Sequence, residues 1–174
     1  MIVCVLSDSH DNIPLLNDAI QQAKQQGAET VLHCGDIVAP STLKTATKHN
    51  LPIHAIHGNN QGDTFSLSKL SSNETNQITY YGQDAGITLA GKKIFLVHYP
   101  HYAKAMCTTG LWDIVCCGHS HNVSVEKIKN IQQQETLCIN PGTVGGVAGK
   151  PATYVLLYLD ENAINHKICE VNGI

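Results

Sequence analysis

The sequence predicts a mixed α/β fold in which two β-sheets pack face to face with helices outside. Residues 1–60 alternate short apolar runs with segments of helical periodicity, and the order β-α-β-α-β favours right-handed parallel strands. From about residue 87 onward the chain is mostly a succession of strand-like segments, which suits a second sheet. The length of 174 residues fits one core, so we expect a single domain over residues 1–174.

The expected elements of the first third end at clear local signals. The apolar run IVCVL at residues 2–6 stops at a polar segment and predicts a strand. A helix follows, with Asn12 as its N-cap, Pro14 in its first turn and Gly27 beyond its end. The other elements expected here are a strand within 29–36, a helix at 40–49 and a strand within 52–60.

The rest of the chain is expected to contain mainly strands. Residues 61–84 are polar and rich in Ser and Asn, which predicts a loop or lid with a short helix near Leu67–Leu70. Strands at 87–89 and 93–97 form a hairpin around Gly91. The later expected elements are a helix at 101–109 and strands at 113–117, 123–128, 135–139, 153–159 and 164–171.

Composition excludes several classes of function. A net charge of -3 without any basic run gives no strong footprint for nucleic acid or for an acidic membrane surface. No apolar stretch approaches the roughly 18 residues of a membrane span, and the first residues lack the basic start of a signal peptide. The 7 cysteines show no C-x-x-C spacing, so we expect buried thiols and a reducing, cytoplasmic location.

Side chains that bind metals follow five of the expected strands. They are Asp8 and His10, Asp36, Asn59, His98, and the pair His119 and His121. In an open α/β sheet the carboxyl ends of the strands line a crevice where ligands bind, so we expect these side chains to meet. Packing alone does not explain such a series.

The types of these side chains restrict the metal. Imidazole, carboxylate and amide ligands together suit two divalent transition-metal ions such as Mn, Ni, Fe, Co or Zn, whereas Ca and Mg prefer oxygen alone. Seven ligands are too many for one ion but fit two ions that share a carboxylate, the arrangement used for in-line displacement at phosphorus. Glycines at 35, 58 and 118 leave room for tight turns beside the ions.

The ordered motifs D-x-H, G-D, G-N, H and G-H-x-H resemble those of the calcineurin-like metallophosphoesterases. The segments SDSHDN, HCGD and NPGT narrow the resemblance to the small single-domain branch, which includes bacterial and archaeal phosphodiesterases and the retromer subunit Vps29. The resemblance covers roughly residues 3–145. It implies a four-layer α/β/β/α sandwich of two mixed β-sheets flanked by helices.

The resemblance also implies a role for each candidate residue. The first metal would be held by Asp8, His10 and His121, the second by Asn59, His98 and His119, with Asp36 bridging the two. A hydroxide between the ions would attack phosphorus, and the ions and Asn59 would stabilise the developing charge. The residues expected to act in catalysis are Asp36, Asn59 and His98.

Two positions depart from the family pattern. Many larger relatives have a histidine after the motif asparagine that is thought to protonate the leaving oxygen, whereas this chain has Asn60, and an amide cannot be a general acid. His57 and His101 are alternative donors. Relatives often have glycine where Tyr99 and Pro100 stand, so we expect a bulkier wall beside the second metal.

Several polar residues outside the motifs have structural interpretations. Asn140 either braces the ligand loops or is a turn asparagine. His33 and His54 are expected within strands, and His49 and His166 at the surface.

The function expected from these features is hydrolysis of a small-molecule or nucleotide phosphodiester. The chain contains no arginine, and without its bidentate fork a monoanionic diester is favoured over a dianionic monoester. One alternative is a Vps29-like protein-interaction scaffold with vestigial metal binding, although such a scaffold would tolerate loss of ligands that this chain retains. The other is a phosphomonoesterase or protein phosphatase. The natural substrate, the identity of the metals and the oligomeric state, a homo-oligomer included, stay open.

Overall fold

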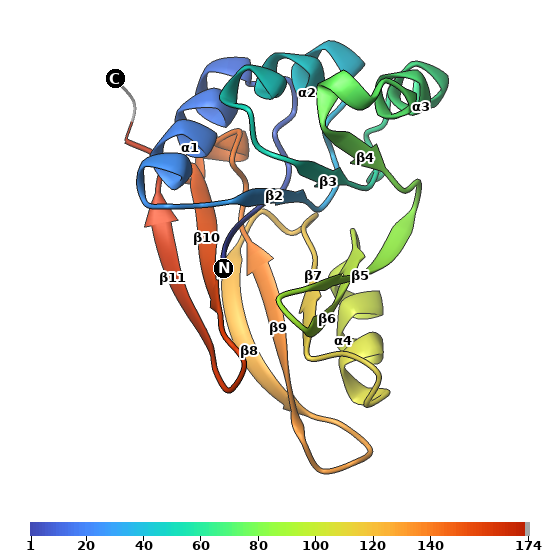
Figure 1. Ribbon diagram of the computed structural model, residues 1–174, viewed down its shortest axis with the longest axis vertical. Helices are drawn as coiled ribbons and strands as arrows, with labels where there is room; N and C mark the ends of the chain where they lie inside the picture. Colours follow the sequence, from blue (N-terminus) through green and yellow to red (C-terminus); the bar gives the residue numbers. More distant parts are fainter. Residues whose placement is uncertain (173–174) are drawn as a thin grey trace.

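The computed structural model describes residues 1–172 and contains two mixed β-sheets that lie face to face (Figure 1). The first sheet has the spatial order β11 (Ile164–Glu170), β10 (Thr153–Leu159), β1 (Ile2–Leu6), β2 (Thr30–His33), β3 (Ile53–Ala55), β4 (Ile78–Tyr80). The second has the order β5 (Asp84–Leu89), β6 (Lys92–Val97), β7 (Ile114–Cys116), β9 (Glu135–Pro141), β8 (Val123–Lys129). The helices are α1 (Ile13–Gln25), α2 (Pro40–Ala46), α3 (Thr64–Ser72) and α4 (Pro100–Thr108). Short 3-10 turns occupy Thr47–His49, Glu74–Asn76 and Val147–Gly149.

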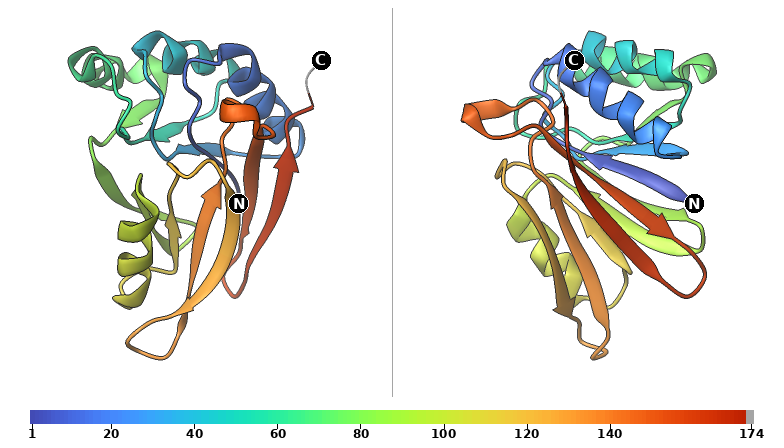
Figure 2. Two further views of the ribbon diagram at one scale, coloured as in Figure 1. Left: turned by 180° about the vertical axis from the view of Figure 1, so that it is seen from behind. Right: turned by 90° about the vertical axis from the view of Figure 1, so that its left-hand side faces the viewer.

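The molecule has the four layers implied by the family resemblance. Helices α1, α2 and α3 cover the outer face of the first sheet, and α4 covers the outer face of the second (Figure 2). Strand β1 shows how the sequence builds these layers, because its side chains alternate between faces. Cys4 and Leu6 pack under the helices, whereas Val3 and Val5 pack between the two sheets. The predicted α/β/β/α sandwich is therefore confirmed.

Several neighbouring strands of each sheet are parallel, so the loops after them lie on the same side of the molecule. β1, β2, β3 and β4 are mutually parallel, and β6 and β7 are parallel in the second sheet. The loops at the carboxyl ends of β1 and β2 are joined by backbone hydrogen bonds. The Asp8 N–H donates to the Gly35 carbonyl at 3.0 Å, and the His10 N–H donates to the Asp36 carbonyl at 3.0 Å.

The prediction for residues 61–84, a loop with a short helix near Leu67–Leu70, is right about the helix and wrong about the rest. Helix α3 is longer than expected, Asp63 caps it by accepting from the Ser66 N–H, and strand β4 follows. The sequence signal is weak because each element contributes one buried apolar side chain, Leu67 in α3 and Ile78 in β4. Pairing of β4 with β3 supplies the order that local propensity does not.

A second correction concerns His49, which is buried rather than at the surface. Its Nε2 lies 2.9 Å from the Asn17 Oδ1 of α1, so the imidazole links the end of the α2 segment to the neighbouring helix. His33 and His54 lie in strands and His166 is exposed, as expected. All seven cysteines are free and buried. Among residues 1–172 no helix has the length and hydropathy needed to cross a bilayer.

Candidate metal centre

The first group of candidate ligands joins the two sheets. Asp8, His10, Asp36 and His121 each present a ligand atom, and these atoms all lie within 4.8 Å of one another. The His121 Nε2 is 3.2 Å from the Asp8 Oδ1, and the His10 Nε2 is 3.4 Å from the Asp36 Oδ2. Both carboxylates are buried and both imidazoles are partly exposed, so the group opens to solvent on its histidine side.

The environment of Asp8 fits a cation in this group. Its Oδ1 is buried and has no hydrogen-bond partner among the described residues, whereas its Oδ2 accepts from the His119 N–H at 2.9 Å. Burial raises the pKa of Asp8, because desolvation penalises the charged form more than the Ser7 hydroxyl and nearby His98 favour it. A divalent ion at Oδ1 would satisfy this oxygen and hold the carboxyl ionised.

The second group consists of His98, Asn59 and His119. The Asn59 Oδ1 lies 3.0 Å from the His98 Nε2 and 2.8 Å from the His119 Nδ1. The His98 Nδ1 faces the Cys34 carbonyl at 2.8 Å and can only donate to it, so in the neutral ring Nε2 carries a lone pair. That lone pair points at the Asn59 oxygen and at the Asp36 Oδ1, 3.3 Å away. Acceptor atoms that converge in this way fit a cation between them.

Asp36 contacts both groups with different oxygens. Its Oδ2 approaches His10 of the first group, and its Oδ1 approaches His98 of the second. The histidines of the GHSH segment divide in the same way: His121 lies beside Asp8, whereas His119 lies beside Asn59. The structure therefore brings all seven predicted residues together, as two groups that meet at one carboxylate.

The backbone at these residues is strained. Asp8, His10, Asp36, His119 and His121 all have φ between 43° and 67°, the left-handed region. Such conformations cost about 1–3 kcal/mol each and cluster at functional sites, where the surrounding structure holds them. Gly58 shows how closely the loops approach, because a Cβ there would overlap the Asp36 carboxylate and the His98 ring.

Asn60 orients the shared carboxylate. Its backbone N–H donates to the Asp36 Oδ1 at 2.8 Å, and its side-chain amide donates to Oδ2 at 2.7 Å. Burial raises the pKa of Asp36, but the two Asn60 hydrogen bonds and nearby His98 and His10 outweigh it, so the pKa lies below its usual value. In the sequence alone Asn60 is recognisable only as a missing proton donor. Its position directly after the motif asparagine was the available signal.

His33 and Asn140 hold the ligand loops in place. The His33 Nδ1 accepts from the Gly35 N–H at 3.3 Å, so its Nε2–H donates to the Ser9 hydroxyl at 3.1 Å and links two loops. Burial lowers the pKa of His33 to about 3, which keeps the ring neutral. The Asn140 amide donates to the Gly118 carbonyl at 2.7 Å and to the Ser120 hydroxyl at 3.0 Å. The bracing interpretation of Asn140 therefore agrees with its contacts.

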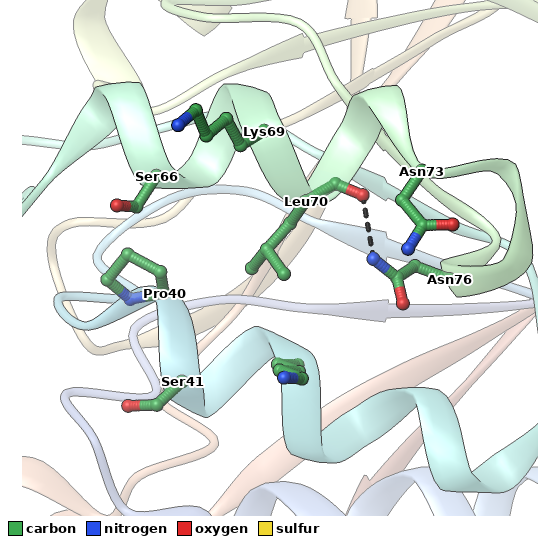
Figure 3. A pocket seen from close by; sticks show the side chains of 8 residues that line it. Pro40, Ser41, Ser66, Lys69, Leu70, Asn73 and Asn76 are labelled. Carbon is green, nitrogen blue, oxygen red and sulfur yellow. Dashed lines mark hydrogen bonds between the residues drawn. The ribbon is translucent and has the colours of Figure 1, made fainter.

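Two hollows of similar size differ in their relation to this centre. One, of about 340 Å³, opens directly against Asn59 and His98. The other, of about 410 Å³, lies between α2 and α3 and is lined by lysine, serine and asparagine side chains, Lys44 and Lys69 among them (Figure 3). None of the seven candidate ligands lines the second hollow, so only the first adjoins the metal centre.

Known proteins share both the sequence and the fold. The chain is 31% identical over 161 residues to a phosphodiesterase of Methanocaldococcus jannaschii, an alignment that covers 90% of this chain and 92% of the relative. A solved archaeal phosphodiesterase superposes with a TM-score of 0.83 at 27% identity, over 97% of this chain and 100% of that one. Zinc-bound Vps29 of Entamoeba histolytica has the same fold, with a TM-score of 0.64 at 16% identity over 99% of this chain and 100% of that one. The profile of the calcineurin-like phosphoesterase superfamily domain matches residues 1–162, and the chain belongs to this superfamily.

Proposed function

We propose that the protein is a phosphodiesterase that uses two divalent transition-metal ions. The observation that carries the proposal is the position of Asp36, whose two oxygens face two separate groups of metal-ligating atoms. Two ions at a shared carboxylate are the arrangement used to clamp both the attacking and the leaving oxygen at phosphorus. The phosphodiesterase of M. jannaschii, similar over 90% of this chain, supports the same reaction.

Each ligand has a distinct proposed role. Asp8, His10 and His121 hold one ion, Asn59, His98 and His119 hold the other, and Asp36 bridges them. Two such ions would lower the pKa of a water held between them and make it a nucleophile near neutral pH. Asp36 stays ionised because Asn60 donates to both of its oxygens. Asn59 and His98 face the adjoining cavity, where they orient the phosphoryl group.

The mixed imidazole, carboxylate and amide ligands favour Mn, Ni, Fe, Co or Zn. We propose a small-molecule or nucleotide diester as substrate, because the chain has no arginine and, among residues 1–172, no lysine lines the cavity beside the second group. A monoanionic phosphate needs fewer cations than a dianionic one. We place the enzyme in the reducing cytoplasm, because its seven cysteines are free thiols.

Hydrolysis of bis(p-nitrophenyl) phosphate and of p-nitrophenyl phosphate tests the proposal. The metal-stripped protein should be inactive, and added Mn or Ni should restore turnover of the diester in preference to the monoester. Asp36→Asn should abolish turnover, whereas Asp18→Asn on α1 serves as a matched control that retains it. Absence of metal-dependent turnover under every condition would contradict the proposed activity and favour a protein-interaction scaffold.

A further inference from the structure

The cavity beside the second group of ligands has the size of a small-molecule site. Its volume of about 340 Å³ lies within the roughly 300–1,000 Å³ typical of such sites. Gly58, Asn59 and His98 form one side, next to the atoms proposed to bind metal. A phosphate held at those atoms would direct one of its ester groups into this space.

Two tyrosines from the start of α4 also line the cavity. Pro100 begins α4, so Tyr99 immediately precedes the helix and Tyr102 lies in its first turn. The Tyr99 ring is held by His119, with ring centroids 4.9 Å apart, and it meets the Tyr102 ring at 89° with centroids 5.8 Å apart. Tyr102 is 50% exposed, which leaves part of its ring free to stack on a ligand.

Besides the imidazoles of His57 and His98 and the two tyrosine hydroxyls, the polar side chains of the cavity are amides. Gln61 and Gln83 line it from the loops after β3 and β4. The Gln61 amide nitrogen faces backbone carbonyls of the β3 loop, which leaves its oxygen to accept from a ligand, whereas the Gln83 amide can both donate and accept. No lysine, aspartate or glutamate among residues 1–172 contributes to the lining. This lining, which among the described residues has no lysine or carboxylate, suits an uncharged occupant that combines a flat apolar face with a polar edge.

We propose that this cavity receives one ester arm of the phosphodiester and that the arm is a nucleoside or a similar group with a planar heteroaromatic ring. Tyr102 stacks on the ring, and Gln61 and Gln83 bind its edge. An alkyl arm would displace water from both exposed amides without replacing its hydrogen bonds, and the lining formed by residues 1–172 offers a charged arm neither a lysine nor a carboxylate. The inference rests on the proposed phosphodiesterase function, because it requires the phosphate to lie at the metal ligands.

Calorimetric binding of two diesters to the Mn-loaded protein tests this assignment. Thymidine 5′-methyl phosphate and dimethyl phosphate carry the same monoanionic phosphate and differ only in the nucleoside. Stacking of one base on an aromatic side chain corresponds to roughly 5- to 150-fold in affinity, and we expect a preference of this order for the nucleoside ester. Tyr102→Ala should remove most of it, and Tyr102→Phe should retain it.

Phe65→Ala is the matched control, because Phe65 is an aromatic residue of α3 that is 67% exposed and lies outside this cavity. Thermal midpoints of all variants show that they are folded. Equal affinity for the two diesters, equal weakening of both by Tyr102→Ala, or binding of neither would overturn the assignment. Turnover of bis(p-nitrophenyl) phosphate by the same samples is measured separately. Its absence would contradict the proposed function, while the binding comparison alone decides the identity of the arm.

Discussion

Removal of the Asn60 side chain should weaken metal binding by releasing Asp36. The Asn60 amide donates to the Asp36 Oδ2 at 2.7 Å, while the backbone N–H holds Oδ1 at 2.8 Å. A hydrogen bond to a charged group contributes about 1.5–3 kcal/mol. In Asn60→Ala only the backbone bond remains, so the carboxylate can rotate and no longer directs one oxygen at each group. We expect metal affinity to fall roughly 10- to 100-fold, the usual effect of losing a partner that orients a ligand.

Calorimetric titration of the metal-free protein with Mn measures this change in affinity. Asn73→Ala is a suitable control, because the Asn73 side chain also makes a local hydrogen bond, accepting from the Thr75 N–H after α3, but does not line the cavity or the candidate metal centre. Loss of a donor also makes a carboxylate more basic, which by itself strengthens metal binding. Unchanged or tighter binding in Asn60→Ala would therefore refute the view that orientation of Asp36 is the controlling factor.

Three further predictions concern the ligand loops. His119→Ala and His121→Ala should each lose one ion from different groups, so elemental analysis should find about one ion in each variant against two in the parent. His33 has a folded pKa of about 3 against 6.5 unfolded, so its contribution to stability is present above pH 6.5 and is lost as pH falls. Denaturation of His33→Gln from pH 7 to 5 should show a pH dependence flatter than the parent's by up to about 1.4 kcal/mol per unit, and identical slopes would contradict this. Gly58→Ala should destabilise the fold by about 1–3 kcal/mol and abolish binding of the second ion, since its Cβ overlaps Asp36 and His98. A Gly58→Ala variant that binds two ions and remains active would contradict the close contact of Gly58 with Asp36 and His98.

The fold was largely predictable because most of its signals are local. Strand β1 and the capped helix α1 coincide with an apolar run and with an N-cap followed by proline. Region 61–84 was only partly predictable, because α3 and β4 each bury only one large apolar side chain. Helix α3 packs against α2 and β4, and β4 pairs with β3. His49 was misplaced for a related reason, since its partner Asn17 is 32 residues away in the chain.

The candidate site shows the same division. Asp8, His10 and the histidines of the GHSH segment were recognisable because ligand type and spacing follow directly from the order of residues at strand ends. The contacts of Asn60 and His33 were not recognisable, because an asparagine or a strand histidine has no characteristic spacing to its partner. Both act through hydrogen bonds between loops that lie far apart in sequence.

The sequence by itself determined the order of the elements, the types of metal ligand and the absence of arginine from the chain. The family resemblance implied the division of the ligands around Asp36, and the structure places the side chains in agreement with it. The tertiary structure alone decided that Asn60 holds both oxygens of Asp36 and that two tyrosines and two glutamines line one cavity. The physical reason is that periodicity and capping act between neighbours in the chain. The contacts of Asn60 and the shape of the cavity depend instead on how loops far apart in the chain pack together.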